Sequence, residues 1–359
     1  MTIRCCARVT RRLVALASLS LAARAKAQDS ATAARSLPPV DVHGFIQVYY
    51  RTGDPTIKDG FRLRKSDLKF SGVLSPKLKW RVTFDAAKVL TVTKSTSNVE
   101  DSTVVTDASI DQRTRILQDA ALTYVVDKSL SFDFGQQIIP LSLEGTISTS
   151  NVETIERTLF IVERSRAVGL GDIRDIGVSA NGQVLNAIEY HIGVFNETGE
   201  GAGTTDPNDQ KSLMGRVVYK PSFVHGLSVG GSGGVEGGPT KQRRERTAGE
   251  IQFRDDHLTL RTEVMSARDG TLRRFGWYGL TAVRPTKRLQ LVARWDDWDR
   301  DRSADRSLTD ATERQVTLGA SILLDTSAKI AFNAIHQTFP FVSAPKPATF
   351  FMAAFQAIF

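Results

Sequence analysis

Lysine and arginine recur at every second position in several segments of the chain, interleaved with carboxylates. Residues 78–86 alternate apolar side chains with Lys79, Arg81, Thr83 and Asp85. A period of two places alternate side chains on one face of an extended strand. A face that carries ammonium and guanidinium groups can donate hydrogen bonds to a permeating or bound anion.

The same alternation identifies basic residues that we expect on polar strand faces lining a pore. They are Lys65, Lys69, Lys79, Arg81, Arg216, Lys220, Arg254, Arg261 and Arg294. The acidic residues expected on these faces are Asp67, Asp85, Asp119, Asp133, Glu189, Glu250 and Glu263. This mixture of signs resembles the transverse field of a general diffusion pore more than an uninterrupted row of arginines.

Other chemistry finds little support. The five histidines include no pair at i, i+2 or i, i+4 with a carboxylate partner, so no zinc site or histidine-based catalytic site is indicated. His191 beside Glu189 could serve a hydrolase, but its alternation favours a titrating residue in a lumen. We therefore expect no catalytic residue, metal or cofactor, and no enzymatic activity.

A short acidic run, residues 296–301, includes Asp296, Asp297 and Asp299. Its carboxylates could bind Ca²⁺. Because Trp295 and Trp298 are interleaved with them, we favour an aromatic girdle at a membrane interface, with the acids solvated at the outer rim.

The elements that must hold these residues are strands. Alternating segments of 9 to 14 residues recur through residues 41–359 and suggest about sixteen strands. Short turns alternate with longer connections, which lie at about 91–112, 138–172, 196–210, 238–244, 298–310 and 340–346. This parity predicts an all-β fold, a transmembrane antiparallel β-barrel with short periplasmic turns and long extracellular loops.

The strand faces agree with a barrel in lipid. In residues 258–264, Leu258, Leu260 and Val264 alternate with Arg261 and Glu263. Residues 347–359 carry phenylalanine or alanine at every odd position from 351 to 359. We expect these apolar faces to meet lipid, because an exposed apolar strand face would promote aggregation in water. A terminal strand buried in a soluble sandwich is the alternative for residues 347–359.

Residues 1–27 have the features of a secretory signal peptide. Four arginines precede an apolar run from Leu13 to Ala23, and Ala25-Lys26-Ala27 forms the expected cleavage site near Ala27. Cys5 and Cys6 both lie in this leader, so the mature chain would have no disulfide. We expect residues 28–40 to be a linker and residues 41–359 to be an outer-membrane barrel.

The leader also accounts for most of the net charge. It contains six lysines and arginines, and removing them lowers the formal net charge from +8 to +2. A basic pI is therefore no argument for nucleic-acid binding by the exported chain. The expected partners are small anionic or hydrophilic solutes and outer-membrane lipid.

Residues 138–172 form the longest connection without a strand period. Loops of this length are usually functional, and this one could fold into the lumen and constrict it. Its charged candidates for the narrowest point are Glu144, Glu163, Arg164 and Arg166. A solvated loop packed over the barrel mouth is the alternative.

At this loop the sequence resembles the phosphate-selective porin O and P family. The residues that carry the resemblance are Gly135-Gln136, residues 140–144, Thr149-Ser150, residues 163–165 and residues 175–177, with residues 61–87 similar to the second and third strands of the family. Leu141 departs from the aromatic residue that the family usually has after this proline. The resemblance implies a sixteen-stranded homotrimeric anion channel, with phosphate as cargo and the third long loop folded inward.

A second basic group, Lys241, Arg243, Arg244 and Arg246, falls in the fifth extracellular connection and could gather anions at the mouth. A solvated loop facing anionic lipid is equally consistent with it. The function expected is passive diffusion of small hydrophilic solutes, anions among them. A general diffusion porin without anion preference, and a closed barrel with a structural or enzymatic role, remain alternatives.

Overall fold

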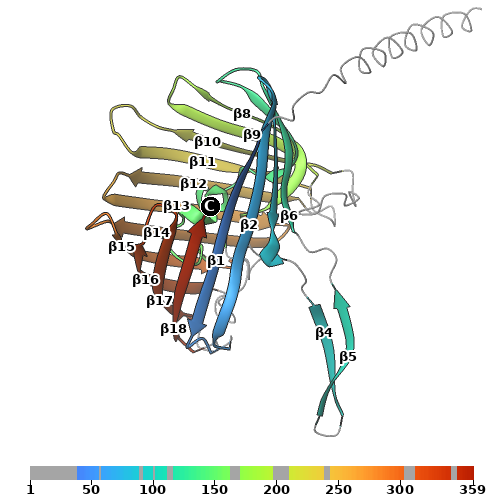
Figure 1. The fold of residues 1–359 in the computed structure, drawn as a ribbon, viewed down its shortest axis with the longest axis vertical. Coiled ribbons are helices and arrows are strands. Elements are labelled where there is room, and N and C mark those ends of the chain that lie inside the picture. Colours follow the sequence, from blue (N-terminus) through green and yellow to red (C-terminus); the bar gives the residue numbers. More distant parts are fainter. Residues whose placement is uncertain are drawn as a thin grey trace, which may run out of the picture. The chain divides into compact units, whose positions relative to one another are not determined.

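A computed structural model describes residues 39–55, 58–88, 92–99, 102–110, 116–161, 170–196, 210–237, 243–302, 312–340 and 346–359. Within these ranges, sixteen strands form one closed antiparallel barrel in which neighbours along the chain pair in space (Figure 1). The barrel predicted from the alternation, with its number of strands, is confirmed.

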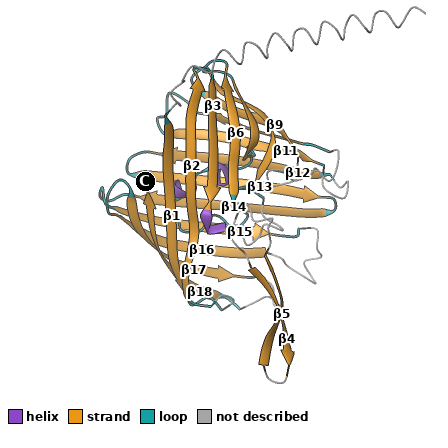
Figure 2. Ribbon diagram, turned by 45° about the vertical axis from the view of Figure 1, so that its right-hand side comes forward, coloured by secondary structure: helices purple, strands orange, loops and turns teal. Residues whose placement is uncertain are grey.

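Each strand of the wall covers one alternating segment of the sequence. The strands are β1 (Val40–Thr52), β2 (Gly60–Ser75), β3 (Leu78–Asp85), β6 (Leu117–Val125), β7 (Ser131–Ile138), β8 (Arg174–Val184), β9 (Ile188–Phe195), β10 (Ser212–Tyr219), β11 (Leu227–Glu236), β12 (Arg244–Arg254), β13 (Leu258–Asp269), β14 (Leu272–Val283), β15 (Leu289–Asp299), β16 (Thr312–Leu323), β17 (Ala328–Thr338) and β18 (Ala348–Ile358). Among the described residues, the helices are η1 (Ala86–Lys88), α2 (Leu143–Thr146) and η2 (Thr149–Asn151), drawn in purple in Figure 2.

The connection expected at 91–112 contains further strands. β4 (Val92–Val99) pairs with β5 (Ser102–Ile110) in a separate two-stranded sheet. Serine, threonine and valine fill both segments, and such residues suit a strand even without a strict apolar alternation. This segment therefore still connects two strands of the wall, β3 and β6, and the sequence pattern did not identify the two strands within it.

The two faces of the wall differ as the alternation predicts. On β13, Leu260 and Val264 are exposed on the outside, whereas Arg261 and Glu263 are buried on the inside. On β18, Phe351 and Phe355 are exposed. β18 pairs with β17 and closes the barrel on β1, so the terminal strand belongs to the wall and not to a sandwich.

A β-bulge interrupts the alternation in β2. Gln47 on β1 opposes Lys65 and Val48 opposes Leu63, so Arg64 is the additional residue. A bulge places two consecutive residues against one partner. The side chains of Arg64 and Lys65 can therefore both point into the barrel. A strict period of two would place only one of them there.

Tight turns close one end of the barrel, which we call the short-turn end. Asp127, Asp255 and Asp325 each accept hydrogen bonds from the backbone N–H groups of residues two and three positions later. Hydrogen bonds lower the pKa of all three carboxyl groups, chiefly from the Ser129 hydroxyl at Asp127 and from the backbone N–H groups at Asp255 and Asp325. The turns are thus fixed by a side chain that the sequence provides at the same place in each.

The opposite end carries the longer connections and is called the long-loop end. One connection there is short, since β13 and β14 are joined through Gly270 and Thr271 alone. Gly270 has a φ of 61°, in the left-handed region that glycine adopts at little cost. Among the described residues, no helix has the length and apolar character needed to cross a membrane.

Candidate functional site

The segment between β7 and β8 lies inside the barrel. Its described residues contact the inward side chains of β11, β13, β14, β15, β17 and β18. The described part begins at Ile139, includes α2 and η2, and resumes at Leu170 after a gap at residues 162–169. We call it the inner loop.

Apolar packing holds one side of the inner loop against the wall. Phe160 is fully buried, and its ring centroid lies 6.0 Å from that of Tyr278 and 6.2 Å from that of Trp298. Met214 and Met265 belong to the same buried cluster. The inside of the wall is thus apolar where it receives the loop, which differs from the uniformly polar interior that alternation suggests.

Arg261 ties β13 to two carboxylates of the inner loop. Its guanidinium donates to Glu153 at 3.0 and 3.2 Å and to Glu144 at 3.3 Å. The side chains of Arg261 and Glu144 are 0% exposed and that of Glu153 is 2% exposed. Arg261 is buried, and its guanidinium is already hydrogen-bonded to two carboxylates. It therefore holds the loop and cannot bind a solute that passes through the lumen.

Glu263, on the same face of β13, receives the start of α2. Its two carboxylate oxygens accept the backbone N–H groups of Leu143 at 2.9 Å and Glu144 at 3.1 Å. The first N–H groups of a helix have no partner within the helix, so an acceptor from outside satisfies them. Ser142 caps the same turn through its hydroxyl, which accepts from Gly145.

Arg294 performs a similar role from β15. Its guanidinium donates to Asp296 at 2.8 Å, to the Thr154 hydroxyl at 2.7 Å and to the Glu156 carbonyl at 2.8 Å. Both side chains of the Arg294–Asp296 pair are 0% exposed. The expectation that Asp296 and Trp298 form a solvated outer rim was wrong, because both point inward against the loop.

Contacts on the far side complete the attachment of the inner loop. Arg64 donates to the Ile155 carbonyl and, at 3.2 Å, to Glu156. Asn333 accepts the Ile155 N–H at 2.7 Å, and Gln356 donates to the Ser150 carbonyl at 3.3 Å. The loop is therefore bound to strands at the beginning and the end of the chain.

A carboxylate at the end of the inner loop lies between two arginines. Asp172 is 3.1 Å from Arg174 and 3.9 Å from Arg157. Burial acts to raise the pKa of Asp172, but the two guanidinium groups outweigh it and lower that pKa from 3.8 to about 2. Asp172 thus stays ionised at any physiological pH.

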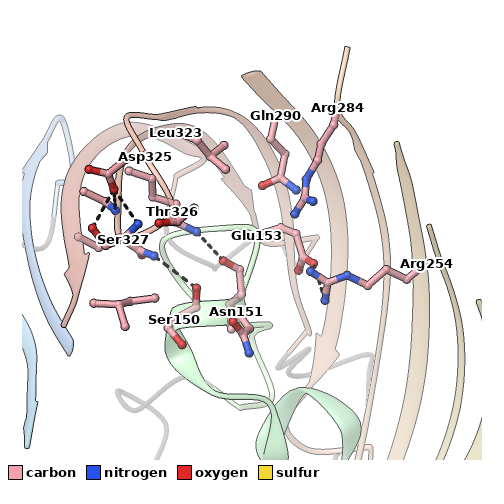
Figure 3. Close-up of a pocket in the computed structure, with 15 residues that line it drawn as sticks. Ser150, Asn151, Glu153, Arg254, Arg284, Gln290, Leu323, Asp325, Thr326 and Ser327 are labelled. Carbon is pink, nitrogen blue, oxygen red and sulfur yellow. Dashed lines mark hydrogen bonds and ion pairs between the residues drawn. The ribbon is translucent and has the colours of Figure 1, made fainter. Parts of the chain in front are cut away.

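A cavity of about 250 Å³ lies between the inner loop and the short-turn end. Figure 3 shows Arg254 and Arg284 extending from their strand ends toward the part of the loop that carries Glu153. Lys329 also lines the cavity and donates to the Val152 carbonyl at 3.2 Å. Arg254 is 3.9 Å from Glu153, whose carboxylate is already held by Arg261.

The other basic residues expected on the polar faces are mostly neutralised by neighbours on the wall. Their shortest pairs are Lys65–Asp67 at 3.0 Å, Arg81–Asp133 at 3.3 Å, Arg216–Glu250 at 2.5 Å and Lys220–Glu189 at 2.5 Å. Within the described residues, no carboxylate lies at ion-pair distance from Lys69, Lys79, Arg284 or Lys329. These four are thus inward basic side chains whose charge no described carboxylate neutralises at ion-pair distance.

The four basic residues predicted in the fifth extracellular connection do not form one group in the structure. Arg244 and Arg246 belong to β12, and Arg246 is 7% exposed with Asp269 at 2.6 Å. Arg243 is 71% exposed, with Glu245 at 3.1 Å. Lys241, Glu163, Arg164 and Arg166 lie outside the described residues, as does the expected leader at residues 1–27.

Several residues of this site escaped the sequence reasoning. Tyr278 donates to Glu144 at 3.4 Å, and nothing in its local pattern distinguishes it from a lipid-facing tyrosine. The inward direction of Arg64 could not be predicted from a strict period of two, because a bulge interrupts the alternation there. Arg284 falls just beyond the end of β14, although continuing the alternation of that strand would have placed it inward. No group of metal-ligating side chains occurs in the part of the chain that the structure describes.

Comparison with known proteins identifies a sequence family. Residues 40–274 match the family described as phosphate-selective porin O and P. A comparison with curated protein sequences finds no match.

Solved structures share the fold at low identity. An anion-selective porin from Comamonas acidovorans has a TM-score of 0.60 at 12% identity, covering 89% of this chain and 99% of that chain. A loop-deletion mutant of OmpT from Vibrio cholerae has a TM-score of 0.59 at 11% identity, with the same coverage. OmpF from Salmonella typhi, with daunomycin, has a TM-score of 0.58 at 10% identity, covering 90% of this chain and 98% of that chain. At such identities the likeness shows the fold alone.

Proposed function

The chain belongs to the phosphate-selective porin O and P family, a family of bacterial outer-membrane porins, and we propose that its channel favours small anions, phosphate among them. Passage is passive diffusion through the lumen beside the inner loop. The observation that carries the anion preference is the set of inward cations without a carboxylate at ion-pair distance among the described residues. These are Lys69, Lys79, Arg284 and Lys329.

The paired charges set the background against which these cations act. An arginine and a carboxylate in contact contribute little net field at a distance, since their charges cancel. The cations left over attract anions and offer donors that replace water around a phosphate or carboxylate group. An anion that reaches the short-turn end would meet Arg254, Arg284 and Lys329 around one cavity, whose lining also includes Glu153, held by Arg261, and Asp325, held by its own turn.

The inner loop is proposed to set the size limit of the channel. Its contacts with β13, β15 and β17 leave the opposite side of the lumen to Lys79 and Arg81 of β3. Two buried arginines hold the described part of the loop in place, and we propose that this part limits the width of the channel. Glu144 acts in this proposal as an anchor of the loop and not as a charge facing the solute.

Two further parts of the proposal rest on likeness to solved structures and on the pattern of the first residues. One of the OmpT structures from Vibrio cholerae is a trimer form, and we propose a homotrimer here as well. We also propose that residues 1–27 are removed on export, with cleavage near Ala27.

Ion selectivity tests the anion preference. Barrels reconstituted in planar bilayers should show a reversal potential of anion-selective sign in a KCl gradient. Changing Arg254, Arg284 and Lys329 together to glutamine should lower the anion-to-cation permeability ratio on the order of several-fold, since the field of the lumen loses three charges. Added phosphate should reduce the chloride current of the wild type more than that of the variant.

Arg314→Gln is the matched control, because Arg314 is an exposed arginine on the outer face of β16, paired with Asp297. It should leave the reversal potential unchanged. A cation-selective wild type would reject the anion preference and leave a general diffusion porin. A barrel without conductance would instead support the closed alternative.

A further inference from the structure

Two arginines face each other across the β13–β14 hairpin. Arg268 and Arg273 are register partners, and both are exposed. Side chains of directly opposed residues in an antiparallel pair lie on the same face and within reach of each other. Here that face is the outside, because Val264 and Trp277 belong to it and are 44% and 37% exposed.

Like charges in this arrangement destabilise a sheet unless a counter-charge lies nearby. Arg268 donates to the Gly270 carbonyl at 3.0 Å, and no carboxylate lies at ion-pair distance from Arg268 or Arg273 in the described residues. Arg302 adds a third guanidinium, stacked on Phe275 at 5.0 Å from the ring centroid. Its own acid, Asp299, is 3.8 Å away. Glu245, the register partner of Arg268 on β12, lies 3.1 Å from Arg243. Among the described residues, the three cations thus lie beside two carboxylates, Glu245 and Asp299, neither of which is at ion-pair distance from Arg268 or Arg273.

The depth of this group in the membrane is informative. Arg273, Phe275 and Trp277 follow one another on the outer face of β14. At about 3.3 Å per residue, Arg273 lies about 13 Å further along the strand than Trp277, which for a strand tilted by about 40° is roughly 10 Å nearer the long-loop end. Tryptophan and phenylalanine mark the lipid interface in barrels, so the arginines lie at headgroup level. The short Gly270–Thr271 turn leaves no long loop of this hairpin above them.

We propose that Arg268, Arg273 and Arg302 form a binding site on the outside of the barrel for the phosphate group of an outer-leaflet glycolipid. Guanidinium groups bind phosphate through paired hydrogen bonds. A phosphate between Arg268 and Arg273 would supply a counter-charge at ion-pair distance, which neither arginine has among the described residues. The aromatic residues below would contact the acyl chains of the same lipid. This site depends on insertion of the barrel in the outer membrane and is independent of the selectivity of its lumen.

Native mass spectrometry of the detergent-solubilised barrel tests the site. The probes are diphosphorylated lipid A, the same lipid after removal of its phosphates, and inorganic phosphate. The wild type should retain the diphosphorylated lipid. The triple variant R268Q/R273Q/R302Q should bind it at least about tenfold more weakly, because the charge-assisted hydrogen bonds are lost. R268K/R273K should bind with intermediate strength, since lysine keeps the charge without the bidentate geometry.

R288Q is the matched control, because Arg288 is an exposed arginine at the short-turn end of β15, away from this leaflet. It should bind the lipid as the wild type does. All variants should keep the wild-type channel conductance, which shows that the barrel is folded. Equal binding by the triple variant, equal binding of the dephosphorylated lipid, or saturation by inorganic phosphate at the same concentration would overturn the proposal.

Discussion

The guanidinium of Arg261 on β13 forms two hydrogen bonds with the carboxylate of Glu153, at 3.0 and 3.2 Å, across 108 residues of sequence. The pair joins the wall of the barrel to the loop inside it. Both side chains are excluded from water, so each depends on the other for its charge to be tolerated.

Replacing Arg261 by glutamine should therefore destabilise the barrel. Glu144 would be left as a buried carboxylate without its cation and Glu153 would keep only Arg254, at 3.9 Å, which costs about 3–5 kcal/mol in the free energy of unfolding. Urea unfolding in lipid vesicles measures the change. The double variant R261Q/E153Q should lose less than the sum of the two single variants. Strict additivity would show that the pair does not hold the loop.

Acid should weaken the attachment of the end of the inner loop. The folded-state pKa of Asp172 is lowered to about 2 from 3.8, since Arg157 and Arg174 outweigh the effect of burial. A carboxyl group whose pKa is lowered on folding stabilises the folded state at pH values above its unfolded-state pKa. For Asp172 this stabilisation is lost as the pH falls from about 4 to about 2. Wild type should thus lose more stability over this interval than D172N.

Asn suits this position in the variant because residue 172 has a φ of 55°, a region that asparagine tolerates. Comparing the urea midpoints of wild type and D172N at several pH values gives the difference. Parallel curves between pH 4 and pH 2 would contradict the assigned ion pairs.

The packing of Phe160 on the wall requires a glycine at residue 276. A Cβ atom there would lie 2.7 Å from Cδ1 of Phe160 and 2.8 Å from Cε3 of Trp298. Gly276→Ala should lower the free energy of unfolding by about 1–3 kcal/mol through overpacking. Phe160→Ala should lower it by about 3–5 kcal/mol through loss of a buried ring.

Gly279→Ala on the same strand provides the control, because its Cβ would meet only Cζ3 of Trp277, at 3.9 Å. That variant should unfold at the wild-type urea concentration. If Gly276→Ala behaved in the same way, the close approach of Phe160 to β14 would be refuted.

Freeing a paired cation on the open side of the lumen should raise anion preference. Asp133 is 3.3 Å from Arg81, so Asp133→Asn leaves Arg81 without its carboxylate. The anion-to-cation permeability ratio should rise on the order of twofold, as the lumen gains one net positive charge. Reversal potentials in a KCl gradient give the ratio. Glu245→Gln removes an acid from the outer face of β12 and should leave it unchanged.

The sequence by itself determined the barrel and the faces of its strands. Alternation is a local property, which residues 258–264 and 351–359 show without reference to any neighbouring strand. Every strand of a barrel in lipid needs it, because one face meets lipid and the other faces the lumen. The number of strands and the inward direction of Arg81 and Arg261 followed from that pattern. The family resemblance also came from short local motifs.

The tertiary structure alone decided which of the inward charges pair with one another. Alternation places Arg261 and Lys79 on the same kind of face, yet Arg261 is buried against Glu153 while Lys79 has no carboxylate at ion-pair distance in the described residues. Such pairing depends on where a loop 108 residues away comes to lie. The bulge at Arg64 likewise depends on the register with β1. Distances between segments arise from closure of the barrel, and no local period encodes them.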